Sequence, residues 1–229
     1  QFAMPSYIEF LMSNKFLGSK SGQGFFKKIK GSDGKSEILR LNLDTNEYEP
    51  QGKVSFPTLE LTKTIDKPID RFKVLIGGKD KAGEFYRASF GAMFAYVSHK
   101  VPEISDDIYK IDDAMKAGFG WENGPFEIWD AVGVQKGIDL AKEAGYEVSD
   151  WAKELASKNE TFYKVSNEGQ TTFYEKNSGN YSAIPGKDSF IILDNLRKNK
   201  TLWSNSGAAI LDLGDGIINF EIRSKMNSL

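Results

Sequence analysis

The chain has 229 residues, enough for one large domain or two small ones, and its 30 basic and 32 acidic side chains leave a net charge of −2. This balance argues against a nucleic-acid-binding surface, and no apolar run approaches the ~20 residues of a membrane span. The chain has no cysteine and one histidine, His99, which excludes disulfides, thiolate metal sites and most zinc or Ser-His hydrolase chemistry.

The N-terminal quarter is predicted to contain a small hairpin and a connector. Residues 37–50 alternate leucine with polar residues and then turn at residues 44–46, which is typical of two short strands. Residues 52–80 mix prolines with polar residues, and we expect them to wrap the surface as a connector. No signal peptide pattern is present, which favours a cytoplasmic protein, and a start at Gln1 suggests a piece of a longer chain.

Two amphipathic helices are predicted between residues 81 and 118. Apolar residues recur every three or four positions in both: Tyr86, Phe90, Met93, Phe94 and Val97, then Ile104, Ile108, Ile111 and Met115. Gly118 is the expected end of the second helix. We expect His99 to face solvent or cap a helix. The carboxylate pairs 106–107 and 112–113 are predicted to be helix-start and solvent-facing charges.

The segment KAGFGWENGPFEIWDAVG, residues 116–133, is unusually dense in glycine and aromatic rings. Gly118 and Gly120 predict a tight connection, and Gly124-Pro125 predicts a new helix with proline at its first position. Short helices then follow, with stops at Gly133 and Gly145, and Ser149 is predicted to cap a helix that begins at Asp150 and Trp151. Four rings are predicted to fill the space where these helices cross: Phe119, Trp121, Phe126 and Trp129.

Two more hairpins are predicted in the C-terminal third. Residues 171–185 turn at residues 177–179, and residues 208–224 turn at Gly214-Asp215-Gly216, where Asp-Gly suits a type I′ turn. A similar sequence pattern occurs in residues 6–28 and 150–176. In each, an aromatic residue follows a capping residue, a leucine comes four residues later, and Gly-Gln precedes a pair of aromatic rings. This similarity indicates either a duplicated domain or a chance likeness of amphipathic segments.

Three segments resemble parts of a known enzyme class. IDDAMKAGFGWENGPFEIWDAVG (111–133) resembles the signature of the C-terminal helical domain of 3-hydroxyacyl-CoA dehydrogenases, and FLGSKSGQGFFKK (16–28) resembles the end of a first copy of that domain. SGAAILDLGDGIINFEIRSKMNSL (206–229) resembles the opening strands of the enoyl-CoA hydratase, or crotonase, fold. The order is similar to bacterial fused dehydrogenase–hydratase proteins of fatty-acid β-oxidation.

The resemblance implies a mainly α fold, like the C-terminal domain of 6-phosphogluconate dehydrogenase, with small flanking β-hairpins. The implied parts are the tail of a first helical copy (1–30), a connector with a hairpin (31–77), a second helical domain (78–190), and a linker with the opening strands of a hydratase domain (191–229). The implied structural motif is Gly124, Pro125, Phe126, Glu127 and Trp129, a rigid corner in a domain that covers the acyl-CoA cleft and makes domain or subunit contacts.

The resemblance also implies a parent enzyme that uses NAD and acyl-CoA substrates, with Rossmann and hydratase domains as partners and a homodimer as an expected assembly. No Gly-x-Gly-x-x-Gly turn after a strand occurs in this sequence, so we expect no bound cofactor, no metal and no catalytic residue here. Two alternatives stay open: a stand-alone helical interaction or dimerisation module, and an intact enzyme with unfamiliar machinery.

Overall fold

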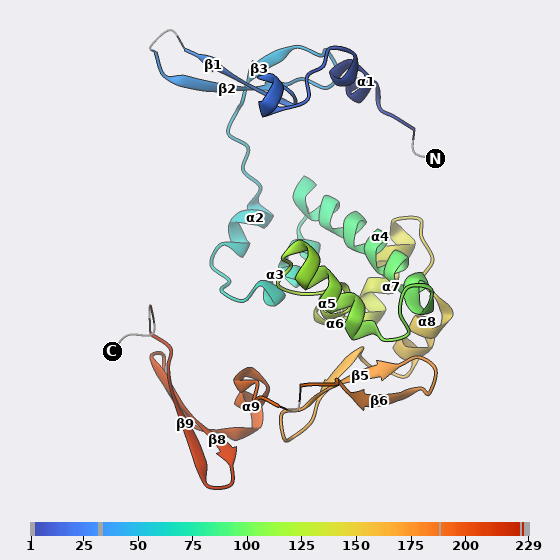
Figure 1. The fold of residues 1–229 in the computed structure, drawn as a ribbon, viewed down its shortest axis with the longest axis vertical. Coiled ribbons are helices and arrows are strands. Elements are labelled where there is room, and N and C mark those ends of the chain that lie inside the picture. The colour runs from blue at the N-terminus through green and yellow to red at the C-terminus, as the bar shows by residue number, and fades with distance from the viewer. Residues whose placement is uncertain (1–2, 32–33, 188, 225, 227–229) are drawn as a thin grey trace. The chain divides into compact units, whose positions relative to one another are not determined.

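The structure is a computed structural model that describes residues 3–31, 34–187, 189–224 and 226 (Figure 1). The chain divides into two compact units between Ser55 and Phe56. None of the helices in these residues has the combination of length and apolar character that a membrane crossing requires.

The first unit is a short helix followed by an antiparallel sheet. Its elements are α1 (Ser6–Ser13), the 3-10 turn η1 (Ser19–Ser21), β1 (Phe26–Lys30), β2 (Ser36–Leu41) and β3 (Tyr48–Pro50), with sheet order β1-β2-β3. The hairpin predicted over residues 37–50 is therefore present, and β1 adds a strand that the sequence pattern did not predict. A third strand is expected physically, because an isolated two-stranded hairpin is marginal in water.

Two helices occupy the segment that was predicted to be a connector. They are α2 (Pro57–Thr62) and α3 (Pro68–Gly77), and each begins with proline at its first position. Leu75 and Ile76 of α3 are buried, and Ile76 belongs to the main core. The surface-wrapping prediction was wrong here, because short helices that rely on tertiary packing carry too few residues to show a clear period.

Five helices build the main core of the second unit. They are α4 (Lys81–Glu103), α5 (Ile108–Phe119), α6 (Pro125–Val132), α7 (Val134–Glu143) and α8 (Asp150–Ser157). Figure 1 shows them gathered together, from green to yellow. The core side chains predicted on α4 are buried or packed against the core, and α4 contains a break at Val101, just before Pro102. The helical domain expected from the sequence is therefore present.

Two small sheets complete the second unit. β4 (Tyr163–Val165), β5 (Thr171–Glu175) and β6 (Asn180–Ala183) form an antiparallel sheet whose Phe173 and Tyr174 are buried in the helical core. After α9 (Leu193–Lys200) come β7 (Thr201–Ser204), β8 (Ala208–Gly214) and β9 (Ile217–Ile222). Both hairpins predicted in this region are present, and each has gained a third strand.

The two segments that share a sequence pattern, residues 6–28 and 150–176, also end their helices in the same way. After α1, Lys15 has φ 57° and the amide of Phe16 donates to the carbonyl of Leu11 at 2.8 Å. After α8, Asn159 has φ 54° and the amide of Glu160 donates to the carbonyl of Leu155 at 3.2 Å. Each helix thus ends in the same left-handed turn with the same five-residue backbone bond. A helix followed by an antiparallel sheet is common to both segments.

Candidate functional site

The motif residues singled out by the sequence form the start of α6. Gly124 occupies the N-cap position and Pro125 the first helical position, so the missing proline N–H leaves no bond unmade. Phe126 and Trp129 are completely buried, and the indole Nε1–H of Trp129 donates to the carbonyl of Val134 at 2.9 Å. Trp129 stacks on Phe94 with ring centroids 4.8 Å apart. These rings therefore belong to the core.

Two of the four predicted corner rings lie elsewhere. Phe119 is 75% exposed and Trp121 is 38% exposed, so the prediction that they fill the helix crossing was wrong. The reason is the position of the helix end. α5 continues through Phe119 and ends at Gly120, which has a φ of 67°, whereas Gly118, the predicted end, lies inside the helix. Phe162 of the segment after α8 takes the missing place beside Phe126, with ring centroids 5.0 Å apart.

A buried carboxylate from α5 caps α6. Asp112 is fully buried, and its Oδ1 accepts the amide N–H of Phe126 at 2.9 Å, while its Oδ2 accepts the amide of Glu127 at 3.1 Å and the hydroxyl of Tyr163 at 2.8 Å. Gly124 has no side chain with which to cap its own helix, and Asp112 supplies the missing acceptor. Asp112 can approach this closely only because residue 124 is glycine, since a Cβ at Gly124 would lie 2.3 Å from Cγ of Asp112.

Glu127, in the first turn of α6, also binds the N-terminal end of this helix. Its Oε2 accepts the amide N–H of Gly124 at 2.8 Å, and its Oε1 accepts from Nζ of Lys116 at 2.7 Å. Lys116 also pairs with Asp113 at 3.1 Å. Glu127 therefore contacts the backbone of its own helix end and pairs with a cation from the last turn of α5. This backbone bond and the Lys116 ion pair together tie the last turn of α5 to the start of α6.

A second carboxylate ties α6 to the sheet. Asp130 accepts the amide N–H groups of Phe162 and Tyr163, both at 2.8 Å. Since Tyr163 also donates its hydroxyl to Asp112, the first strand residue of β4 is held at two points on the helical core. We call Asp112, Glu127, Asp130 and Tyr163 the carboxylate corner.

Burial dominates the electrostatics of this corner. It raises the pKa of Asp112 to about 7, and the neighbouring Glu127 charge acts in the same direction, while the hydrogen bonds to Phe126 and Tyr163 act against it. Burial likewise raises the pKa of Asp130 to about 7. The pKa of Tyr163 is raised above its ordinary value by burial and by Asp112, so its hydroxyl stays a donor. Burial therefore disfavours the charged form of both aspartates in this corner.

Sequence reasoning misjudged Asp112, which was predicted to be a solvent-facing helix charge. Asp113 lies closer to that description, because its side chain is 47% exposed beside Lys116. The missed signal was the spacing. Asp112 lies four residues after the buried Ile108, on the apolar face of α5, and the following helix begins with a glycine that cannot cap itself. A carboxylate on the apolar face of a helix is buried at a high cost unless hydrogen-bond donors surround it, so this position predicts such donors.

His99 has a structural environment. Its Nε2 lies 3.0 Å from the carbonyl of Glu147 and its Nδ1 lies 3.1 Å from the hydroxyl of Ser149. The histidine is exposed and joins the end of α4 to the start of α8, which agrees with the predicted solvent-facing or capping role. Ser149 holds the N-cap position of α8 as predicted, although its hydroxyl bonds His99 and makes no capping bond.

A hollow of about 550 Å³ lies beside the carboxylate corner. We call it the helix-side hollow, and it is lined by polar residues of α5 and α6 and by apolar residues of α3, β4 and the segment after β6, including Ile69, Lys116, Asp130, Tyr163, Val165 and Ile184. The described residues contain no cluster of carboxylates and histidine suited to a metal ion. All strand pairs that the structure describes are antiparallel, so these residues do not fit the parallel β-α-β cradle that holds NAD.

Comparison with known proteins supplies the context for this corner. Residues 88–176 match the family model described as "3-hydroxyacyl-CoA dehydrogenase, C-terminal domain". The matched residues include all of α5–α8 and the carboxylate corner. The whole chain is 36% identical over 230 residues to a "Probable 3-hydroxyacyl-CoA dehydrogenase" of Bacillus subtilis (strain 168). It is 26% identical over 220 residues, 96% of the chain, to a "Putative fatty acid oxidation complex trifunctional enzyme" of Rickettsia prowazekii (strain Madrid E).

The chain is short compared with these proteins. It spans 28% of the length of the Bacillus protein and 26% of the length of the Rickettsia protein. No solved structure matches the chain.

Proposed function

We propose that this chain works as the helical, non-catalytic part of a longer fatty-acid β-oxidation enzyme, because residues 88–176 match the family model of the 3-hydroxyacyl-CoA dehydrogenase C-terminal domain. In that enzyme the helical domain forms one wall of the acyl-CoA cleft and a docking surface for neighbouring domains. The whole protein oxidises 3-hydroxyacyl-CoA to 3-ketoacyl-CoA with NAD and carries a fused enoyl-CoA hydratase. A homodimer and a cytoplasmic location stay predictions.

The observation that carries the proposal is the carboxylate corner inside the matched segment. Four side chains that hold α5, α6 and β4 at fixed angles lie together within residues 112–163, in the middle of the family match. Such a corner serves a rigid wall better than a catalytic centre. A base or nucleophile must reach its substrate, whereas Asp112 is fully buried and every oxygen contact of Asp112 and Asp130 named above is to a protein donor.

The NAD-binding and proton-transfer steps are assigned to parts of the enzyme outside this chain. NAD would supply hydride acceptance when bound, and a dinucleotide fold must hold its nicotinamide against the substrate carbon. His99, the single histidine, contacts the Glu147 carbonyl and the Ser149 hydroxyl, and no carboxylate among the described residues orients it as a base.

Calorimetry and activity assays on the chain test this assignment. We expect no NAD binding, no oxidation of 3-hydroxybutyryl-CoA and no hydration of crotonyl-CoA, whereas the full gene product that contains the chain oxidises 3-hydroxybutyryl-CoA with NAD. Turnover by the chain itself that is abolished in His99→Ala would refute the non-catalytic assignment. Absence of NAD-dependent oxidation in the full gene product would refute the proposed enzyme and favour the stand-alone interaction module.

A further inference from the structure

Asn123 and Gly124 form an Asn-Gly pair directly before α6, and this pair is chemically labile. The backbone nitrogen of the glycine can attack Cγ of the asparagine side chain, which expels ammonia and leaves a five-membered cyclic imide. Water then opens the imide at either carbonyl, so that an aspartyl or an isoaspartyl residue replaces the asparagine. Asparagine is among the thermolabile residues of proteins, and a following glycine hinders the ring closure least because it has no Cβ.

Packing requires a glycine at the second position of this pair. A Cβ at Gly124 would lie 2.3 Å from Cβ and Cγ of Asp112, the carboxylate that caps α6. A larger residue would therefore push α6 away from α5. The side chain of Asn123 is half-buried, lines the helix-side hollow and makes no hydrogen bond among the residues that the structure describes. No bonded group therefore holds its amide away from the attacking nitrogen.

The nitrogen itself is held in the folded protein. The N–H of Gly124 donates to Oε2 of Glu127 at 2.8 Å, and Oε1 of Glu127 is anchored by Nζ of Lys116 at 2.7 Å. To attack Asn123, the nitrogen must lose its proton and turn towards the side-chain Cγ, and both steps require this bond to break. A hydrogen bond to a carboxylate is roughly twice as strong as one between neutral groups. Glu127 therefore opposes the ring closure.

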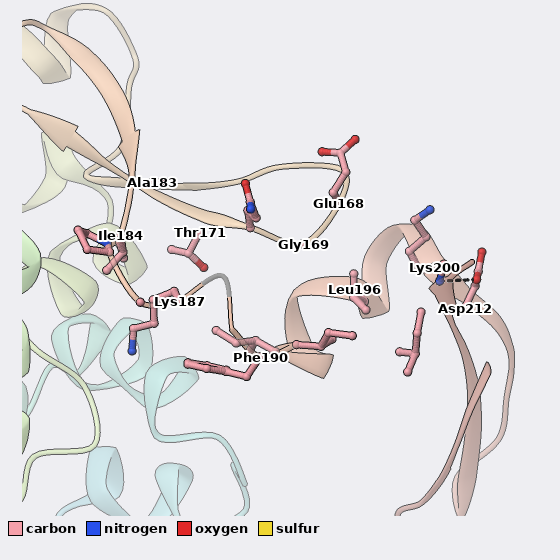
Figure 2. A pocket seen from close by; sticks show the side chains of 17 residues that line it. Glu168, Gly169, Thr171, Ala183, Ile184, Lys187, Phe190, Leu196, Lys200 and Asp212 are labelled. Carbon is pink, nitrogen blue, oxygen red and sulfur yellow. Dashed lines mark hydrogen bonds between the residues drawn. The ribbon is translucent and has the colours of Figure 1, made fainter. Parts of the chain in front are cut away.

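A carboxylate at position 123 would be unfavourable where it forms. The charged groups that line the helix-side hollow are three carboxylates and two ammonium groups: Asp113, Glu127, Asp130, Lys116 and Lys187. Lys187 also lines an adjoining hollow of about 690 Å³, where its side chain extends away from Asp212 (Figure 2). A fourth carboxylate would add to the excess of negative charge. An isoaspartyl link would also lengthen the backbone directly before Gly124, where Asp112 leaves no room. The modification would therefore loosen the carboxylate corner.

We propose that Asn123 is a latent deamidation site, and that Glu127 protects it by holding the nitrogen that would attack. The site reacts only when the start of α6 separates from the Glu127 carboxylate, so local opening sets the rate of ammonia loss. After the reaction, the added charge and the lengthened backbone oppose closure of the corner. This inference rests on the geometry of residues 123–127, and it is independent of the reaction that the whole protein catalyses.

Peptide mapping by mass spectrometry on the full chain measures ammonia loss at Asn123 at neutral pH, and the wild type unfolded in urea gives the intrinsic rate. We expect the folded chain to react about ten- to a hundredfold more slowly, the factor that a hydrogen bond to a charged group supplies. Asp215→Asn adds an internal comparison, because it places a second Asn-Gly pair in an exposed turn where the amide of Gly216 has no described partner. That pair should react about tenfold faster than Asn123 in the same folded molecules.

Three variants locate the protection. Glu127→Ala should speed ammonia loss at Asn123 by about tenfold, whereas Glu127→Gln should stay close to the wild type, since its side-chain oxygen still accepts the N–H of Gly124. Val148→Ala is the control for general destabilisation, because it opens a cavity in the core outside the carboxylate corner, and it should leave the rate unchanged. If Glu127→Ala does not fold, the wild type decides. Urea below the unfolding transition should raise hydrogen exchange at the Gly124 amide and ammonia loss by the same factor.

Three results would overturn the proposal. Equal rates of ammonia loss in the folded and the urea-unfolded wild type would mean that the corner gives no protection. A wild-type rate in Glu127→Ala would mean that another group holds the nitrogen or shields the side chain. Equal acceleration in Val148→Ala and Glu127→Ala would assign the protection to the general stability of the fold, and not to the bond between Glu127 and Gly124.

Discussion

The contact between Gly124 and Asp112 gives the sharpest stability prediction. In Gly124→Ala the new Cβ would lie 2.3 Å from both Cβ and Cγ of Asp112 and 2.5 Å from its Cα, distances that side chains do not tolerate. The backbone of Gly124, with φ −80° and ψ 167°, suits alanine well, so conformational strain is not the issue. The start of α6 must therefore move away from α5.

That movement has a cost that follows from the bonds it breaks. Overpacking typically costs about 1–3 kcal/mol. The amides of Phe126 and Glu127 would also lose the Asp112 carboxylate at 2.9 and 3.1 Å, and an unsatisfied buried donor costs about 1–3 kcal/mol. Because a partial shift relieves the overlap while it weakens the bonds, the two costs do not add fully. We expect Gly124→Ala to lower the free energy of unfolding by about 3–5 kcal/mol.

Gly118→Ala is the matched control for this prediction. Gly118 lies inside α5 with nothing within 4 Å of an added Cβ. Alanine should raise the stability there by about 0.5–1 kcal/mol through its higher helix propensity. The same substitution six residues apart should therefore act with opposite signs.

Urea unfolding followed by tryptophan fluorescence measures both variants, since the two buried indoles of Trp129 and Trp151 report on the helical core. Hydrogen exchange at the amides of Phe126 and Glu127 should also accelerate in Gly124→Ala alone. The reasoning fails if Gly124→Ala unfolds within about 0.5 kcal/mol of the wild type, or if both variants shift in the same direction.

Three further predictions concern other parts of the second unit. Trp129→Ala removes a fully buried ring and its bond to the carbonyl of Val134, and it should lower the unfolding free energy by about 3–5 kcal/mol in the same assay; an unchanged melting temperature would contradict its buried position. The raised pKa of Asp112, about 7 against an ordinary 3.8, means that the folded state binds more protons than the unfolded state between these values. Its contribution to stability is therefore lost as pH rises towards 7, by up to about 1.4 kcal/mol per pH unit. Between pH 5 and pH 8 the unfolding free energy of the wild type should therefore fall relative to that of Asp112→Asn. Arg197→Met removes the bidentate partner of the half-buried Glu221 and should lower the stability of the β7–β9 sheet by about 1–3 kcal/mol in thermal unfolding. Lys67→Met breaks only an exposed pair with Asp194, so it should change stability by less than about 0.5 kcal/mol in the same assay.

The sequence by itself determined the helical centre of the chain and several of its helix starts and turns. The apolar spacing in α4 predicts its buried face because a 3.6-residue period is a local property of the chain. Pro125 at the start of α6 and the turn at Gly214-Asp215-Gly216, with φ values of 90°, 53° and 77°, were equally readable, since allowed backbone dihedrals depend on residue type alone. The family resemblance rested on this same local signature.

Tertiary structure alone decided which polar and aromatic residues the core accepts. Phe119 and Trp121 look like core rings by composition, yet both are exposed on either side of the helix end at Gly120, and Phe162 from a distant segment packs beside Phe126. Asp112 looks like a surface charge, yet it is buried because three donors from residues 14, 15 and 51 positions away converge on it. Long-range hydrogen bonds of this kind leave no period in the sequence, because the energy that fixes them comes from partners the local pattern cannot see.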